Sequence, residues 1–95
     1  MIVHIVCFKY KSDIDDDART RHRERLRALR DIDGILDLQV GEDIVRSSRS
    51  YDTGLVIRFR DRAALDAYQI HPRHVPVAQF GPSSCERVIA VDFEA

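Results

Sequence analysis

Tryptophan is absent from this sequence of 95 residues, and cysteine, proline and glycine are scarce, with two, three and four copies. Two cysteines within apolar, strand-like runs do not make a disulfide framework, so Cys7 and Cys85 are expected to be buried thiols. No apolar run approaches the ~20 residues that a membrane-spanning helix needs. The first eight residues include His4 and lead to Lys9, which is not the pattern of a secretion signal. These absences predict a cytoplasmic protein without a membrane partner.

An excess of one charge is also missing, because 15 Lys and Arg residues face 16 Asp and Glu residues, a net charge of −1 at pH 7. Proteins that bind nucleic acid usually carry a basic excess or a clustered basic patch, so nucleic acid is not expected as a partner. Hydrophobic residues make up 44% of the chain and charged residues 33%, which is typical of globular proteins. At this length we expect a single domain over residues 1–95.

Four segments combine β-branched or aromatic residues with the patterning of strands. The first segment is apolar on both faces, with His4 and Val6 on one face and Ile5 and Cys7 on the other. A strand of this kind is usually covered on both sides. The expected strands are 2–10, 35–41, 51–60 and 85–93.

Two helices are expected between these strands, at 15–30 and at 62–70. Each presents a narrow apolar stripe to the core and charged residues to water. The stripes hold Ala18, His22, Leu26 and Leu29 in the first helix and Ala64, Leu65 and Tyr68 in the second. The second helix ends before Pro72, because proline restricts the preceding residue away from helical angles. Segment 75–84 contains two prolines and a glycine and is expected to be irregular, with one helical turn at most.

The element order β-α-β-β-α-β is that of the ferredoxin-like α+β fold, a four-stranded antiparallel sheet with both helices on one face. The other face of this sheet would carry apolar side chains from two strands, namely Val3, Ile5, Cys7 and Val56. Exposing such a surface is unusual for a monomer. We therefore expect a homodimer that packs through the open sheet face.

The candidate catalytic residues lie in the first strand and around the end of the second helix. His4 is on the strand face assigned to the helices, and Tyr68, His71 and His74 follow one another at spacings of three. These residues can meet in a pocket between sheet and helices, because the first strand is central in the ferredoxin-like order. A histidine near its free pKa can take a proton at neutral pH, and a tyrosine hydroxyl can donate to the oxyanion that forms. Such a trio suits aldol-type ring closure or enolisation with neither a metal nor an organic cofactor.

Two other interpretations of these residues stay open. A buried His4 is a common structural device, and a histidine before a proline, such as His71, can simply cap a helix; the chain would then be a non-catalytic dimeric binding or stress protein. Alternatively, His4, His71 and His74 could hold a metal ion, since a His-x-x-His spacing across a helix end can converge on one ion. No assured carboxylate or cysteine ligand stands beside them.

Several short motifs resemble those of the stress-responsive A/B barrel (Dabb) domain family. They are His4-Ile5-Val6-Cys7-Phe8-Lys9, Gly34-Ile35, Gly41, Tyr51-Asp52, the stretch 64–74 and Asp92. The most specific of them is Tyr-x-x-His-Pro-x-His at 68–74. The resemblance spans essentially the whole chain, and it implies a ferredoxin-like unit whose homodimer closes a dimeric α/β barrel from two sheets.

The family's plant members include stress-induced proteins and a polyketide cyclase that closes an aromatic ring by aldol condensation without a cofactor. By resemblance, the working residues of that cyclase fall on His4, Tyr68 and His74. The family's acidic residue near the C-terminal strand matches Asp92, to which no role is assigned. In the first helix the chain departs from the cyclase, because His22 and an arginine stand where the cyclase has aromatic residues beside its substrate tail.

These observations predict a site for a small, partly apolar, oxygenated metabolite. Its candidate catalytic residues are His4, Tyr68 and His74, and its candidate contact residues are His22, Leu26, Leu55 and His71. If the protein is an enzyme, the expected chemistry is that of a cofactor-independent cyclase or isomerase.

Overall fold

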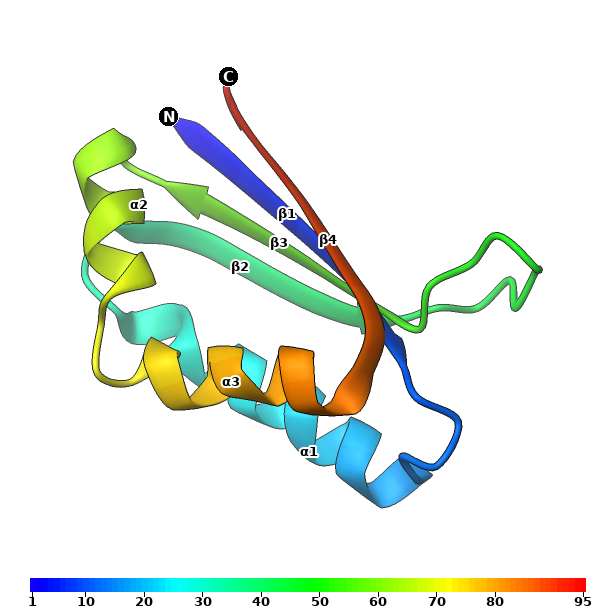
Figure 1. Ribbon diagram of the computed structural model, residues 1–95. Helices are drawn as coiled ribbons and strands as arrows, with labels where there is room; N and C mark the ends of the chain where they lie inside the picture. Colours follow the sequence, from blue (N-terminus) through cyan, green and yellow to red (C-terminus); the bar gives the residue numbers. More distant parts are fainter.

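The computed structural model describes residues 1–95 as a four-stranded antiparallel sheet with three α-helices on one of its faces (Figure 1). The strand order across the sheet is β2-β3-β1-β4. The elements are β1 (Ile2–Tyr10), α1 (Asp16–Arg27), a short 3₁₀ helix η1 (Ala28–Asp31), β2 (Ile35–Glu42), β3 (Thr53–Phe59), α2 (Arg62–Gln69), α3 (His74–Ser84) and β4 (Cys85–Glu94). This architecture confirms the predicted ferredoxin-like α+β fold.

Both predicted helices begin at an aspartate whose side chain caps the first turn. The Asp15 carboxylate accepts from the amide of Ala18 at 2.8 Å, and the Asp61 carboxylate accepts from the amide of Ala64 at 2.9 Å. Each bond satisfies one of the amides that a helix start leaves without a partner. None of the helices is long and apolar enough to cross a membrane.

The segment expected to be irregular forms a third helix instead, and this prediction was wrong. Pro76 lies in the first turn of α3, where a missing amide costs little, and Pro82 lies in its last turn. The backbone carbonyl of His71 accepts from the amides of His74 and Val75, which starts the helix. Val77 and a phenylalanine of α3 pack against the core and hold the helix on the sheet.

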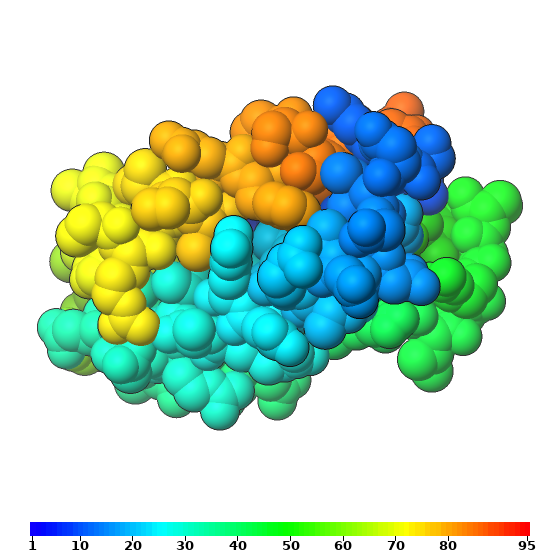
Figure 2. Space-filling model, turned by 90° about the horizontal axis from the view of Figure 1, so that it is seen from below, coloured from blue at the N-terminus to red at the C-terminus, as the bar shows by residue number.

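The core lies between the sheet and the helices. Its buried members come from all four strands and from α1, η1 and α2, with Ile57 and Phe59 among the most buried. Seen from the helix side, α1 and α3 lie next to each other across the sheet (Figure 2). This layer buries the faces of β1 and β3 that the sequence pattern assigned to the interior.

The opposite face of the sheet has no helix over it (Figure 1). On this face Ile5 is paired with Val56 of β3 on one side and with Val91 of β4 on the other. The same face continues along β4 with Ile89 and Phe93, and these three β4 side chains are 46–53% exposed. The predicted apolar face therefore exists, and β4 makes it larger than expected.

Gly34 makes the tight turn before β2 and is predicted to be intolerant of a side chain. Its φ is +91°, and a Cβ atom there would lie 2.5 Å from the Cβ of Ala64. Gly34→Ala should lower the free energy of unfolding by about 2–4 kcal/mol, because backbone strain and overlap with α2 add together. Urea unfolding would measure this loss. Asp33→Ala, at the exposed neighbouring position, should change stability little, and equal losses in both variants would refute the explanation.

Candidate functional site

A cavity of about 540 Å³ lies between the sheet and the helix layer. Strand β1 provides its floor, the end of α2 and the length of α3 form one wall, and β4 forms the other. A group of polar side chains lines one part of the cavity, and most of the other lining residues are apolar. The polar group is His4, Tyr68, Gln69, His74 and Asp92.

His4 and Asp92 form a pair across neighbouring strands at the polar end. The two residues are direct partners in the β1–β4 register, so their side chains leave the same face of the sheet. Nδ1 of His4 is hydrogen-bonded to a carboxylate oxygen of Asp92. Because a carboxylate only accepts, Nδ1 of His4 carries the proton of this hydrogen bond. Asp92 thus orients His4, a role that sequence reasoning left unassigned.

Tyr68 brings an unsatisfied donor to the cavity. Its side chain is 1% exposed, and its hydroxyl is buried without a hydrogen-bond partner. Burial raises the pKa of Tyr68 above its ordinary value, so the hydroxyl keeps its proton at neutral pH. Leaving a buried hydroxyl unpaired costs about 1–3 kcal/mol, and a ligand oxygen in the cavity would recover that cost.

His74 is the first residue of α3, and its ring lies against that of Tyr68. The ring centroids are 4.1 Å apart, and Nδ1 of His74 faces the carbonyl oxygen of Gln69 at 3.4 Å. Because that carbonyl accepts, Nδ1 carries the proton and Nε2 holds the lone pair. Burial, followed by the neighbouring His4 and His71, lowers the pKa of His74 below its ordinary value. His74 is therefore a neutral imidazole at pH 7, the form that can accept a proton.

The remainder of the lining is mostly apolar, apart from Glu86 and Arg87 of β4. Its lining includes Val6, Phe8, Leu26, Leu55, Val77 and Val88. A molecule that fills both ends would place oxygens at the histidines and tyrosine and carbon atoms over β1 and α3.

The structure brings together most of the predicted site residues. The same cavity is lined by His4, Tyr68, His74, Leu26 and Leu55.

Two predicted contact residues, His22 and His71, lie outside this lining. Nδ1 of His71 accepts from the backbone amide of Arg73 at 3.0 Å, so His71 shapes the turn into α3. His22 belongs to a separate buried network behind Phe8. In the isolated chain neither histidine is placed to touch a molecule in the cavity.

The network around His22 is built on the hydroxyl of Tyr10. That hydroxyl is 2.7 Å from Nδ1 of His22 and 3.0 Å from the hydroxyl of Thr53, which also accepts from Nε of Arg23 at 2.8 Å. The His22 ring stacks on Phe80, with centroids 4.4 Å apart. Burial, with help from the charge of neighbouring arginines, lowers the pKa of His22 to about 4. This histidine is a neutral packing element of the core.

His22 should make the protein sensitive to acid. Its pKa of about 4 in the folded chain lies below the ordinary 6.5, so between these pH values the unfolded chain binds a proton that the folded chain does not. The free energy of unfolding should then fall by about 3 kcal/mol from pH 6.5 to pH 4 through this residue. Urea unfolding across that range should give a smaller slope for His22→Phe than for the wild type. Identical slopes would contradict this assignment.

The metal-site alternative gains no support from the arrangement of ligands. No group of three or more His, Cys, Asp or Glu side chains in the chain is arranged to hold a metal ion. His71 is engaged by the amide of Arg73, apart from the cavity that His4 and His74 line.

Sequence comparison connects this geometry to a family. The profile of the family described as Stress responsive A/B Barrel Domain matches residues 2–95. The chain belongs to that family. It is 30% identical over 99 residues to stress-response A/B barrel domain-containing protein DABB1 of Arabidopsis thaliana, an alignment that covers 100% of this chain and 47% of that protein. The chain spans less than half the length of the curated A/B barrel relatives it matches.

Solved structures agree on the fold. A dimeric ferredoxin-like protein of unknown function from Thermobifida fusca superposes with a TM-score of 0.90 at 23% identity, covering 99% of this chain and 90% of that one. The hydroxynitrile lyase from Passiflora edulis superposes with a TM-score of 0.86 at 16% identity, covering 97% and 90%. At such identities these likenesses establish the ferredoxin-like fold.

Sequence reasoning missed one wall of the cavity. Val77, Ala78 and Gly81 line it from α3, and this segment was expected to be irregular. Gln69, whose carbonyl accepts from His74, was also not singled out. A signal was present in the spacing of His74, Val77, Ala78 and Gly81, which lie at intervals of three and four residues and so share one helix face.

Proposed function

We propose that the cavity binds a small, partly apolar, oxygenated metabolite and acts on it by acid–base chemistry without a cofactor. The observation that carries the proposal is the pairing of an unpartnered, buried Tyr68 hydroxyl with a neutral His74 in one cavity. A donor and an acceptor of protons are both left free there. A carbonyl compound with an acidic neighbouring C–H would engage both.

The two groups have complementary roles in such a reaction. Nε2 of His74 removes a proton from the carbon beside a carbonyl, and the Tyr68 hydroxyl donates to the oxyanion that develops on the carbonyl oxygen. His4, oriented by Asp92, contacts the same oxygen or a neighbouring one from the sheet floor. The resulting enolate can close a ring by attack on a second carbonyl or can be reprotonated elsewhere, which are cyclase and isomerase outcomes.

The cavity of this chain favours ligands of limited charge. The polar end holds two imidazoles, a phenol, an amide and the carboxylate of Asp92. The rest of the lining adds one acidic residue, Glu86, and one basic residue, Arg87, and no lysine lines the cavity. Oxygenated aromatic and polyketide-like compounds meet this description, and the plant polyketide cyclase of the family acts on such a compound. The structural likeness to a hydroxynitrile lyase also supports a lyase- or cyclase-like reaction in this fold.

We further propose that the chain works as a homodimer joined through its open sheet face. The face carries a continuous set of apolar side chains on β1, β3 and β4, and the Thermobifida fusca neighbour is itself dimeric. Burial of apolar surface contributes about 25 cal/mol per Å², so covering such a face strongly favours association. Two sheets packed in this way would form the dimeric barrel that the sequence resemblance implies.

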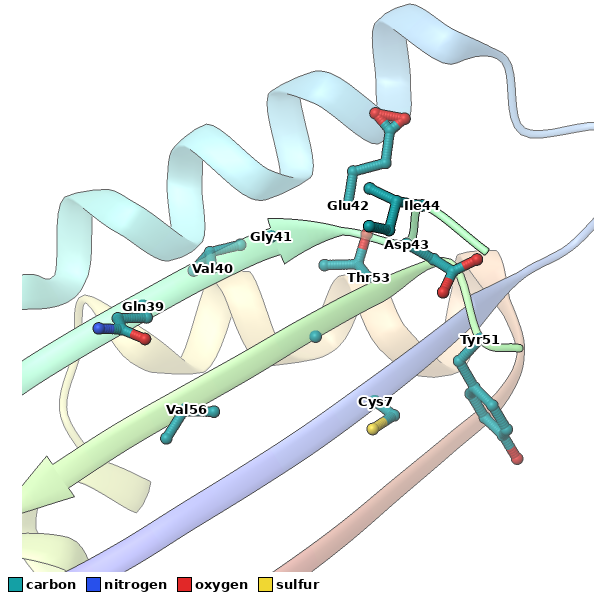
Figure 3. A pocket seen from close by; sticks show the side chains of 11 residues that line it. Cys7, Gln39, Val40, Gly41, Glu42, Asp43, Ile44, Tyr51, Thr53 and Val56 are labelled. Atoms are coloured by element: carbon teal, nitrogen blue, oxygen red, sulfur yellow. The ribbon is translucent and has the colours of Figure 1, made fainter. Parts of the chain in front are cut away.

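A hollow of about 510 Å³ at one end of this face gives the partner a place to insert side chains. It forms where Gly41, Gly54 and Cys7 pair across three strands and so leave little side-chain volume. Figure 3 shows Cys7, Val56 and Tyr51 around it. In the homodimer, protruding apolar residues of the second copy would fill this space.

A two-step experiment tests the proposed function. Thermal-shift screening with oxygenated aromatic and polyketide-like compounds should find ligands, and incubation followed by mass spectrometry should find a product. Binding with turnover supports the enzyme. Binding that needs Tyr68 but yields no product would favour a non-catalytic binding protein, and an absence of any ligand from these classes would contradict the proposal.

A further inference from the structure

The turn that joins α2 to α3 is tied to the rest of the chain by one side chain, that of Arg73. Nη2 of Arg73 donates to the backbone carbonyl of Ala28 at 2.7 Å and to the carboxylate of Asp31 at 2.8 Å. The other hydrogen bonds of this turn stay within α2, α3 and the turn itself. The Arg73 contact is therefore the one hydrogen-bonded link between the start of α3 and η1.

The acceptors are well suited to a guanidinium. Ala28 is the C-cap of α1, where backbone carbonyls lack helical partners and a positive charge is favourable. The hydrogen bond and charge of Arg73 lower the pKa of Asp31 below its ordinary value, so the carboxylate stays ionised. Arg73 thus links the α2–α3 turn to two separate acceptors, the carbonyl of Ala28 and the carboxylate of Asp31.

The turn that Arg73 holds in place leads directly into His74, the first residue of α3. Arg73 immediately precedes His74, and its own amide donates to Nδ1 of His71, so both histidines of the motif are fixed on either side of the anchored residue. The His74 ring contacts the Tyr68 ring at a tilt of 33°, and its Nδ1 makes a long 3.4 Å hydrogen bond to Gln69.

We propose that Arg73 is a positioning residue, which by clamping the α2–α3 turn to η1 holds the His74 ring against Tyr68 and inside the cavity. The inference relies on the proposed function only for what His74 does to a ligand. The positioning itself is a property of the free protein and can be measured without one.

Several titratable groups lie around His74, and two of them, His4 and His71, add to the effect of burial in lowering its pKa. Tyr68 lies on its ring from α2, His71 lies in the same turn, and His4 and Asp92 approach from β1 and β4. A loosened turn would move His74 away from all of them and toward water. The pKa of His74 should then rise toward its ordinary value, because burial is the main cause that lowers it.

The test is an NMR titration of the histidine rings in the intact protein. In Arg73→Ala, the pKa of His74 should rise toward that of a free histidine, and the NOEs between the rings of His74 and Tyr68 should weaken. Arg73→Lys keeps a donor at this place and should restore both observables in part. Arg62→Ala is the matched control, because it breaks an exposed arginine–aspartate pair of 3.0 Å on α2, and should leave both unchanged.

A folded Arg73→Ala protein with the wild-type His74 pKa and ring NOEs would overturn the inference. If Arg73→Ala does not fold, Asp31→Asn serves instead, since it removes one acceptor and leaves the Ala28 carbonyl. It should give a smaller change in the same direction, and no change would again overturn the inference. Because no ligand is used, these outcomes are independent of whether the proposed function holds.

Discussion

Replacing Ile5 with aspartate is expected to abolish the proposed homodimer and leave monomeric or aggregated protein. Ile5 lies in the middle of the open face, between Val56 and Val91. In the homodimer its side chain would be buried, and a carboxylate there would cost on the order of 3–5 kcal/mol per copy. Sedimentation equilibrium should give a mass of twice the 11.0 kDa of one chain for the wild type. The variant should not show this dimeric mass.

An exposed isoleucine on the other side of the molecule supplies the control. Ile70, at the end of α2, is 79% exposed, and Ile70→Asp should keep the dimeric mass. A wild-type protein that stays a monomer of 11.0 kDa at micromolar concentration would contradict the dimer. So would an Ile5→Asp variant that assembles like the wild type.

Once a substrate is found, His74→Ala is expected to lower turnover by about 10²–10⁴, because the general base is lost. In the wild type, activity should fall as the pH drops through the pKa of His74, since protonation removes the lone pair on Nε2. Burial holds that pKa below the ordinary histidine value, so the fall should begin at a lower pH than for a free histidine. Steady-state kinetics across pH would measure both effects.

Tyr68→Phe distinguishes the base from the hydrogen-bond donor. It removes one donor to the oxyanion and should lower turnover by about 10²–10³, with the pH dependence of His74 retained. The loss of an unpaired buried hydroxyl should not destabilise the free protein. If His74→Ala turns the substrate over at the wild-type rate with an unchanged pH profile, the mechanism is wrong and the binding-protein interpretation is preferred.

Much of the fold was predictable because its signals are local. Asp15 and Asp61 stand before apolar stripes of helical period, and each caps the helix that follows it. The alternation in β1 separates His4 and Val6 from Ile5, and the structure places these on the predicted faces. The pairing of His4 with Asp92 depends on the β1–β4 register, which a single sequence does not reveal.

The third helix was missed for a physical reason. Pro76, Gly81 and Pro82 disfavour a helix in general, but Pro76 lies in the first turn, where an amide has no helical acceptor, and Pro82 removes only one amide bond near the end. Contacts of Val77 with the core then stabilise the helix. Tertiary packing outweighed local propensity here.

The misplaced contact residue His22 shows a different limit. Its position on the inner stripe of α1 correctly predicted burial. Whether a buried histidine meets the cavity or the core depends on which aromatic ring stands between them. Here Phe8, which lines the cavity, contacts the His22 ring edge-on with a centroid distance of 4.8 Å and separates it from the cavity.

The central claim is that the cavity between sheet and helices is the ligand site. The NMR signals of the four histidine rings allow a direct test of it. Two of them, His4 and His74, line the cavity, whereas His22 and His71 do not. In an NMR titration with a compound found by thermal shift, the ring signals of His4 and His74 should move and saturate together, while those of His22 and His71 stay in place. A bound compound that moves only His22 or His71, or no histidine at all, would contradict the account.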